Sequence, residues 1–159
     1  MPEVFANTTP LQYLHRLGQM DWLREFYGRI VVPVAVADEL EAGRRLGARV
    51  PELTAFPWIE IRRAPEPMPA FPRFIHRGEA EVLALAQAAD APLVIIGGLM
   101  ARAHAQTLGL RCTGTPGVIL RAKREQRMAA VAPVLAQLQT EGFRIAPATL
   151  TEVLRLAGE

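Results

Sequence analysis

Several absences in the sequence exclude whole classes of protein. There is a single cysteine, Cys112, so no internal disulfide can form, which is typical of a reducing compartment. No apolar run approaches the ~20 residues that a membrane-spanning helix needs. The first ten residues, MPEVFANTTP, have neither the basic nor the apolar region of a secretory signal. We therefore expect a cytoplasmic protein that does not associate with membranes.

Motifs of several enzyme classes are missing as well. The chain has no Gly-x-Ser-x-Gly, no phosphate-binding GxxxxGK[ST] and no dinucleotide-binding GxGxxG. Its histidines, His15, His76 and His104, lie too far apart to show zinc-ligand spacing. Lysine is nearly absent, Lys123 being the only one, and the net charge is +2. Arginine suits bidentate phosphate contacts, but so small a net charge does not by itself identify a nucleic-acid-binding protein.

The length and composition are those of one globular domain. Of 159 residues, 50% are apolar and 21% are charged, which is ordinary usage for a chain with a real core. No internal repeat, low-complexity tract or linker interrupts it. We expect a single domain over residues 1–159.

The stretch Arg77–Cys112 predicts helix, strand, helix, strand. Leu93–Ile96 is a continuous apolar run between a proline and two glycines, which is typical of a parallel strand buried on both faces. Flanking helices make this a βαβ unit and the fold class α/β. In open α/β sheets, ligands bind outside the carboxyl ends of the strands. Here that end is Gly97–Gly98, which carries no side chain.

The remaining elements surround this unit. Thr9 is the predicted N-cap of the first helix, with Pro10 at its first position. Four prolines in Ala64–Pro72 predict an extended loop. The other predicted strands are Val4–Ala6, Arg29–Val32 and an edge strand Trp58–Ile61. The other predicted helices are Pro10–Gly18, Asp21–Tyr27, Pro33–Gly43, Val118–Arg124, Val131–Glu141 and Ala148–Leu156, with a broken helix over Arg44–Leu53.

Glu79 is the most informative acid. It lies at the start of a helix and shares the apolar stripe of Val82, Leu83 and Ala86, so it would lean inward and need a cation or a donor. The alternative is an acid that only favours the first helical turn, and the spacing alone favours this alternative. Glu81 points away from the stripe, and we expect it to be solvated.

Other polar residues fall at expected strand ends or helix starts. Glu39 could lean toward the carboxyl edge of the sheet or be an exposed helix charge. Asn7 ends the first strand and could instead bond its own backbone in a turn. Thr113 and Thr115 end another strand, or cap the next helix.

The whole chain resembles the PIN-domain-like proteins, specifically the group related to VapC-type toxins. The resemblance is carried in order by Asn7–Leu11, Pro33–Leu40, Arg77–Glu81, and Gly114–Val118 followed by Arg121–Arg124. It implies a Rossmann-like, three-layer α/β/α sandwich around a parallel sheet. It also implies metal-dependent RNA cleavage, with acidic residues holding magnesium or manganese, and often an antitoxin partner or self-association.

The resemblance implies which residues of this sequence occupy the catalytic positions of the family. Only some of these positions carry the expected acid. The first-strand acid of the family corresponds to Asn7, and its next two acids correspond to Glu39 and Glu79. Its acidic pair after the central strand corresponds to Gly97–Gly98, so both carboxylates are missing. Arg102 is kept in the following helix, and Thr115 completes the candidate catalytic set.

The missing carboxylates determine the functional hypotheses. Magnesium prefers octahedral oxygen coordination with carboxylates as anchors, and Glu39 and Glu79 leave two. The first hypothesis is a degenerate nucleic-acid-associated homologue with impaired or lost ribonuclease activity. The second is an active magnesium- or manganese-dependent endoribonuclease toxin. The third is a non-enzymatic domain that binds a protein or an anion at Gly97–Gly98.

The sequence supports two more expectations. Gly97→Asp with Asn7→Asp should restore two ligands and raise metal affinity. A partner or a second copy should bind an exposed apolar patch, for which the candidates are Trp22, Leu23 and Phe26, or Leu150, Val153, Leu154 and Leu156.

Overall fold

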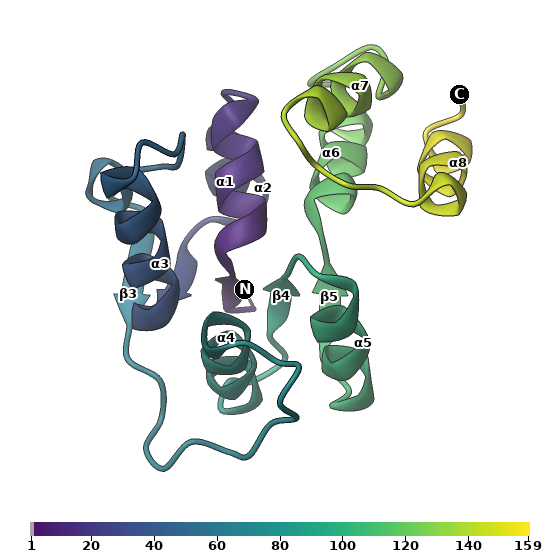
Figure 1. Ribbon diagram of the computed structural model, residues 1–159. Helices are drawn as coiled ribbons and strands as arrows, with labels where there is room; N and C mark the ends of the chain where they lie inside the picture. The colour runs from purple at the N-terminus through teal and green to yellow at the C-terminus, as the bar shows by residue number, and fades with distance from the viewer. Residues whose placement is uncertain (1) are drawn as a thin grey trace.

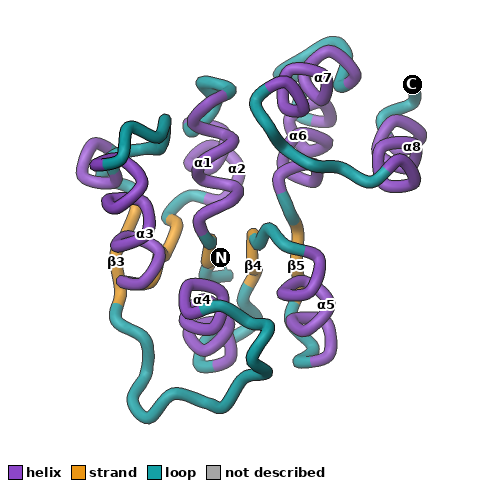
Figure 2. The backbone as a smooth tube through the Cα atoms, viewed as in Figure 1, coloured by secondary structure: helices purple, strands orange, loops and turns teal. Residues whose placement is uncertain are grey.

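A computed structural model describes residues 2–159 and contains one five-stranded, fully parallel sheet. The strand order is β3-β2-β1-β4-β5 (Figures 1 and 2). The strands are β1 (Val4–Ala6), β2 (Ile30–Pro33), β3 (Ile59–Arg62), β4 (Leu93–Ile95) and β5 (Arg111–Thr113). Helices flank the sheet, and the predicted three-layer α/β/α, Rossmann-like fold is confirmed.

The helices keep the predicted order with small shifts at their ends. They are α1 (Thr8–Arg16), α2 (Asp21–Tyr27), α3 (Val34–Arg45), α4 (Arg77–Gln87), α5 (Leu99–Thr107), α6 (Thr115–Arg124), α7 (Ala132–Thr140) and α8 (Pro147–Leu156). Helix α1 begins earlier than predicted, so Asn7 and not Thr9 is its N-cap. The broken helix predicted over 44–53 is instead the end of α3, a loop and a short 3-10 helix, Leu53–Ala55.

The register of the central strands places the candidate site residues side by side. In β1 and β4, Val4 pairs with Leu93 and Ala6 pairs with Ile95. The residues just after these strands, Asn7 and Ile96–Gly97, therefore meet at the carboxyl edge of the sheet. The apolar strands β1 and β2 are buried along their whole length, as expected for parallel strands covered on both faces.

Glu81 is not solvated, contrary to the prediction. It is 8% exposed, and its Oε1 accepts a 3.1 Å hydrogen bond from the backbone N–H of Ala35 in the first turn of α3. Its Oε2 accepts a 3.0 Å bond from Nε of Arg77. The N-cap of α3 is Pro33, which has no capping side chain, so a carboxylate from α4 binds one of the free N–H groups there.

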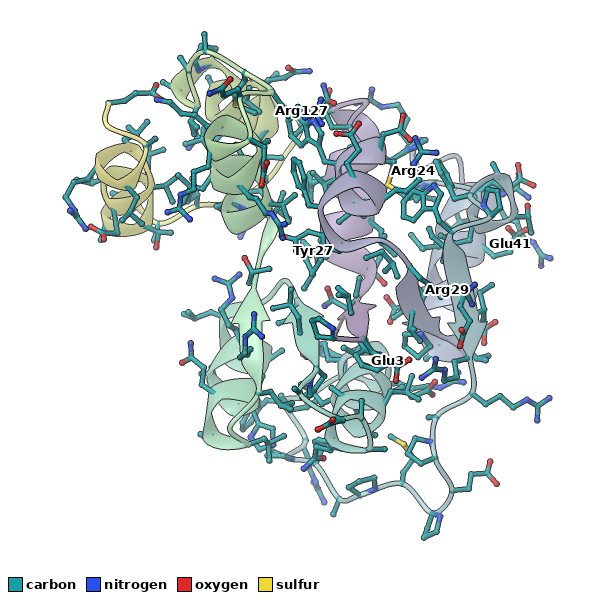
Figure 3. All side chains as sticks on the ribbon, turned by 180° about the vertical axis from the view of Figure 1, so that it is seen from behind. Glu3, Arg24, Tyr27, Arg29, Glu41 and Arg127 are labelled. Carbon is teal, nitrogen blue, oxygen red and sulfur yellow. The ribbon has the colours of Figure 1, made fainter. Side chains whose placement is uncertain are left out.

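The helices after β5 are held against α1 and α2. Arg121 lies over the rings of Phe26 and Tyr27, with its Cζ 5.3 and 4.8 Å from the two ring centroids. Arg127 forms a 2.9 Å ion pair with Glu25, and Figure 3 shows Arg127 beside the helices of the N-terminal half. Trp22, Leu23 and Phe26 are buried, so the prediction that they form an exposed docking patch is wrong. Of the alternative patch on α8, Val153 is buried and Leu156 is exposed.

Within residues 2–159, no helix is both long and apolar enough to cross a membrane.

Candidate functional site

The carboxyl edge of the sheet carries an acidic cavity of about 250 Å³. It lies at the junction between β1 and α1, where the start of α4 packs beside α3. Its walls are Asn7, Thr8, Thr9, Glu39, His76, Gly78 and Glu79. The structure thus brings Asn7, Glu39 and Glu79 together, three residues that the sequence places far apart.

Glu39 is held from two sides. Its Oε2 accepts a 2.5 Å hydrogen bond from Oγ1 of Thr8. Its Oε1 lies above the first turn of α4, where a Cβ added at Gly78 would be only 2.6 Å away. Gly78 therefore gives the carboxylate room to approach the amino end of α4, whose dipole favours a negative charge.

Glu79 is partly buried in the same cavity, and its pKa is raised above the usual value for glutamate. Burial is the main cause, and the nearby negative charge of Glu39 adds to it, while His76 acts in the opposite direction. A buried carboxylate whose ionisation is opposed by a neighbouring acid is an arrangement that a cation would stabilise.

Asn7 uses its side chain to bind the neighbouring strand. It is 5% exposed, and its Oδ1 accepts a 3.0 Å hydrogen bond from the backbone N–H of Gly97. Its Nδ2 donates a 3.4 Å bond to the carbonyl oxygen of Gly97. An ionised aspartate could accept the first bond but could not donate the second. The amide is therefore matched to this position, where it joins the ends of β1 and β4.

Thr9 occupies the space in which a side chain at position 97 would lie. A Cβ added at Gly97 would overlap Cβ of Thr9 and would lie 2.6 Å from its Cγ2 and 2.9 Å from its Oγ1. This packing argues against the expectation that an aspartate at position 97 restores a metal ligand, because even its first carbon fits only if Thr9 moves. A Cβ added at Gly98 would meet only ordinary contacts, 3.9 Å from Cβ of Ala101 and from Oε1 of Glu79, but the φ of +90° strains any L-residue.

A second cavity of about 530 Å³ lies on the other side of Thr9. Its walls include Gly97, Gly98, Arg102, Thr115 and Arg144. Two members of the predicted catalytic set, Arg102 and Thr115, therefore line this cavity, whereas Asn7, Glu39 and Glu79 line the acidic one. Thr9 lines both and separates them.

The donor set of the acidic cavity fits one weakly held divalent ion. Glu39 and Glu79 supply two carboxylates, and water could complete an octahedral shell around magnesium or manganese. Among residues 2–159, no group of three or more histidine, cysteine or acidic side chains is arranged to hold a metal. A two-ion site would need more carboxylates than this cavity offers.

The sequence did not identify the residues that position Glu39 and that block position 97. Thr8 positions Glu39, Gly78 makes room for it, and Thr9 closes position 97. The only available signal was the run Asn7-Thr8-Thr9 itself, which also fits an ordinary turn into a helix. Arg144 was missed because its segment reaches the sheet edge only through the tertiary fold.

Comparison with known proteins gives one family. The family model DUF3368, described as a PIN domain, matches residues 3–159. None of the curated proteins and none of the solved structures compared with the chain matches it.

Proposed function

The chain belongs to this PIN-domain family, and we propose that it is a toxin–antitoxin-type homologue whose metal-dependent ribonuclease activity is impaired or lost. Family membership supports a nucleic-acid-associated protein. PIN domains generally use magnesium or manganese, bind RNA and often pair with an antitoxin. A cytoplasmic location, an antitoxin partner and a homodimer are parts of the same proposal.

The observation that supports impairment is the contact between Thr9 and Gly97. It closes the end of β4 to any side chain, and the amide of Asn7 is already bonded to the same glycine. What remains for a cation is Glu39 and Glu79, with Thr8 bound to the former. When bound, magnesium or manganese would activate water and stabilise charge on the scissile phosphate. Two carboxylates give weak binding of one ion.

The alternative is an active magnesium- or manganese-dependent endoribonuclease toxin. The observation in its favour is that Glu39 and Glu79 still face one cavity, next to the hydroxyl of Thr8. Mg²⁺ can be held by one or two carboxylates together with substrate phosphates. An RNA strand could then supply the missing ligands.

Calorimetric titration with manganese, together with cleavage of single-stranded RNA, separates the two proposals. We expect binding in the millimolar range and no cleavage above that of Glu39→Gln/Glu79→Gln, which removes both carboxylates. Asp38→Asn is the matched control, since Asp38 is an exposed acid on the same helix. Tight manganese binding and cleavage that survive in Asp38→Asn but disappear in the double variant would establish the active enzyme instead.

A further inference from the structure

We propose that the second cavity binds a phosphate monoester with a flat apolar body, the chemistry of a nucleoside 5′-monophosphate. The source could be a free nucleotide or the phosphorylated 5′ end of an RNA strand. The site involves neither Glu39 nor Glu79, and it does not depend on whether the acidic cavity holds a metal.

Arg102 supplies a fixed positive charge at the base of the cavity. Its Nη2 donates a 3.3 Å hydrogen bond to the carbonyl oxygen of Ile96, just past the end of β4. Gly114 leaves room for its guanidinium, because a Cβ added there would overlap the group. Its Nε is buried with no hydrogen-bond partner, and within residues 2–159 Arg102 forms no ion pair with an acid. A positioned guanidinium that lacks a carboxylate is suited to a phosphate.

Two helices begin at this cavity, and neither has a capping side chain. Helix α5 starts after Gly98 and α6 starts after Gly114, and neither N-cap residue provides a side-chain hydrogen bond. Their first N–H groups and their dipoles favour an anion. Thr115, the first residue of α6, lines the cavity, is 1% exposed, and its Oγ1 has no hydrogen-bond partner in the described part of the chain. A buried hydroxyl without a partner is costly, and an oxygen of a bound ligand would relieve that cost.

Part of the lining is apolar and aromatic. The rings of Tyr13 and Phe143 meet edge to face, with their centroids 5.1 Å apart. Leu99, which is 81% exposed, and Pro116 lie on the same cavity. At about 530 Å³, the cavity falls within the range of small-ligand sites, roughly 300–1,000 Å³. A ligand with one anionic group and one flat apolar body fits this mixed lining.

The segment between α7 and α8 completes the cavity and is fixed to α1. It crosses in front of the start of α6 (Figure 1), and Arg144 from this segment adds a second positive charge to the lining. The carbonyl oxygen of Glu141, just before the segment, accepts a 3.0 Å bond from Nη1 of Arg16. The wall is therefore held in place without a ligand, which lowers the entropic cost of binding.

Calorimetry in EDTA with five probes tests the site. The probes are inorganic phosphate, adenosine 5′-monophosphate, adenosine, and a short RNA with either a 5′-phosphate or a 5′-hydroxyl. We expect the monophosphate to bind at least about tenfold more tightly than adenosine or phosphate alone, because each of these lacks one half of the ligand. Preference for the 5′-phosphorylated RNA over the 5′-hydroxyl form would identify a strand end as the source. Binding of the monophosphate but of neither RNA would identify a free nucleotide.

Three variants locate the binding. Arg102→Gln should weaken the monophosphate at least about tenfold, the usual consequence of losing a charged hydrogen bond. Thr115→Val should also weaken binding while leaving the melting temperature equal or higher, because it removes an unpartnered buried hydroxyl. Arg144→Gln should also weaken binding. Because Arg144 is exposed, this variant tests the charge of the cavity even if Arg102→Gln does not fold. Arg111→Gln, an exposed charge at the start of β5, is the matched control and should bind normally.

Equal affinity for adenosine and its monophosphate would overturn the proposal. So would monophosphate binding that is unchanged in Thr115→Val and in Arg144→Gln, or the absence of binding at millimolar concentrations.

Discussion

The two cavities at the carboxyl edge of the sheet share Thr9 as a wall and have opposite charge. Within residues 2–159, the smaller is lined by Glu39 and Glu79 and by no arginine, whereas the larger is lined by Arg102 and Arg144 and by no acid. The difference arises from the segments that come after the strands. Acids reach the edge from α3 and α4, whereas Gly114, just after β5, leaves space for Arg102. One sheet edge can thus have two chemically different halves, divided by a single side chain.

The strongest test of this division is Gly97→Asp, which places a side chain where Thr9 lies. We expect the free energy of unfolding to fall by about 3 kcal/mol or more, from overpacking together with a charge at a buried position. Thermal and urea denaturation measure it. Adding Thr9→Gly to Gly97→Asp should recover a large part of the lost free energy of unfolding. The recovered amount measures the coupling between the two positions. A Gly97→Asp protein that is stable and binds manganese more tightly would contradict the separation of the two cavities by Thr9.

Asn7→Asp tests the link between β1 and β4. The variant loses the amide donor to Gly97 and places a carboxylate beside a carbonyl oxygen, so we expect a loss of about 1–3 kcal/mol. Urea denaturation measures the loss, and Asn7→Ala gives the cost of removing both bonds. If Asn7→Asp is as stable as the parent and gains metal affinity, the amide is not needed for stability. An aspartate at position 7 can then act as a metal ligand in the acidic cavity.

Glu81→Ala separates a structural acid from the acids of the cavity. It leaves the N–H of Ala35 without its partner, and removal of a helix cap costs about 1 kcal/mol. Denaturation of the variant should show this loss, whereas metal and nucleotide binding should not change. An altered manganese affinity would instead mean that Glu81 takes part in the acidic cavity.

Glu79→Gln should have the smallest effect on stability, which in EDTA should be visible only as a change in its pH dependence. The pKa of Glu79 is raised in the folded state, so its contribution to stability is fully present below the unfolded value and is lost as pH rises through the folded one. In EDTA, melting temperatures of the parent should therefore fall, relative to those of Glu79→Gln, as pH rises above about 4.3, the usual pKa of an unfolded glutamate. Asp90→Asn, in an exposed turn, controls for a generic loss of charge. Parallel pH profiles for the parent and Glu79→Gln would contradict the burial of this carboxylate.

The fold could be predicted because its signals are local. Leu93–Ile96 is apolar throughout and is bounded by proline and glycine, and the edge position of the Trp58–Ile61 segment, observed as β3, was predicted from its alternating pattern. The placement of Glu39 and Glu79 at one cavity agrees with the rule that helix starts gather at the carboxyl edge of a parallel sheet.

The details of packing could not be predicted, because they depend on contacts between distant segments. Glu81 lies off the apolar stripe of its own helix, yet it is buried because the start of α3 needs a hydrogen-bond acceptor. The sequence predicts an exposed docking patch at Trp22 and Phe26. Both are buried, and Arg121 of α6 covers the ring of Phe26. The overlap of a side chain at position 97 with Thr9 depends on backbone positions that no periodicity specifies.

The pair of bonds between Asn7 and Gly97 has a consequence for hydrogen exchange. The side-chain amide of Asn7 presents an oxygen and an N–H to Gly97 much as a backbone peptide group would, so it adds one more rung to the β1–β4 ladder. The amide proton of Gly97 is bonded and buried, although it lies at the end of the ladder, where exchange would ordinarily be fast. Its protection factor in a two-dimensional NMR spectrum would therefore report, at a single residue, how often the Asn7–Gly97 hydrogen bond opens.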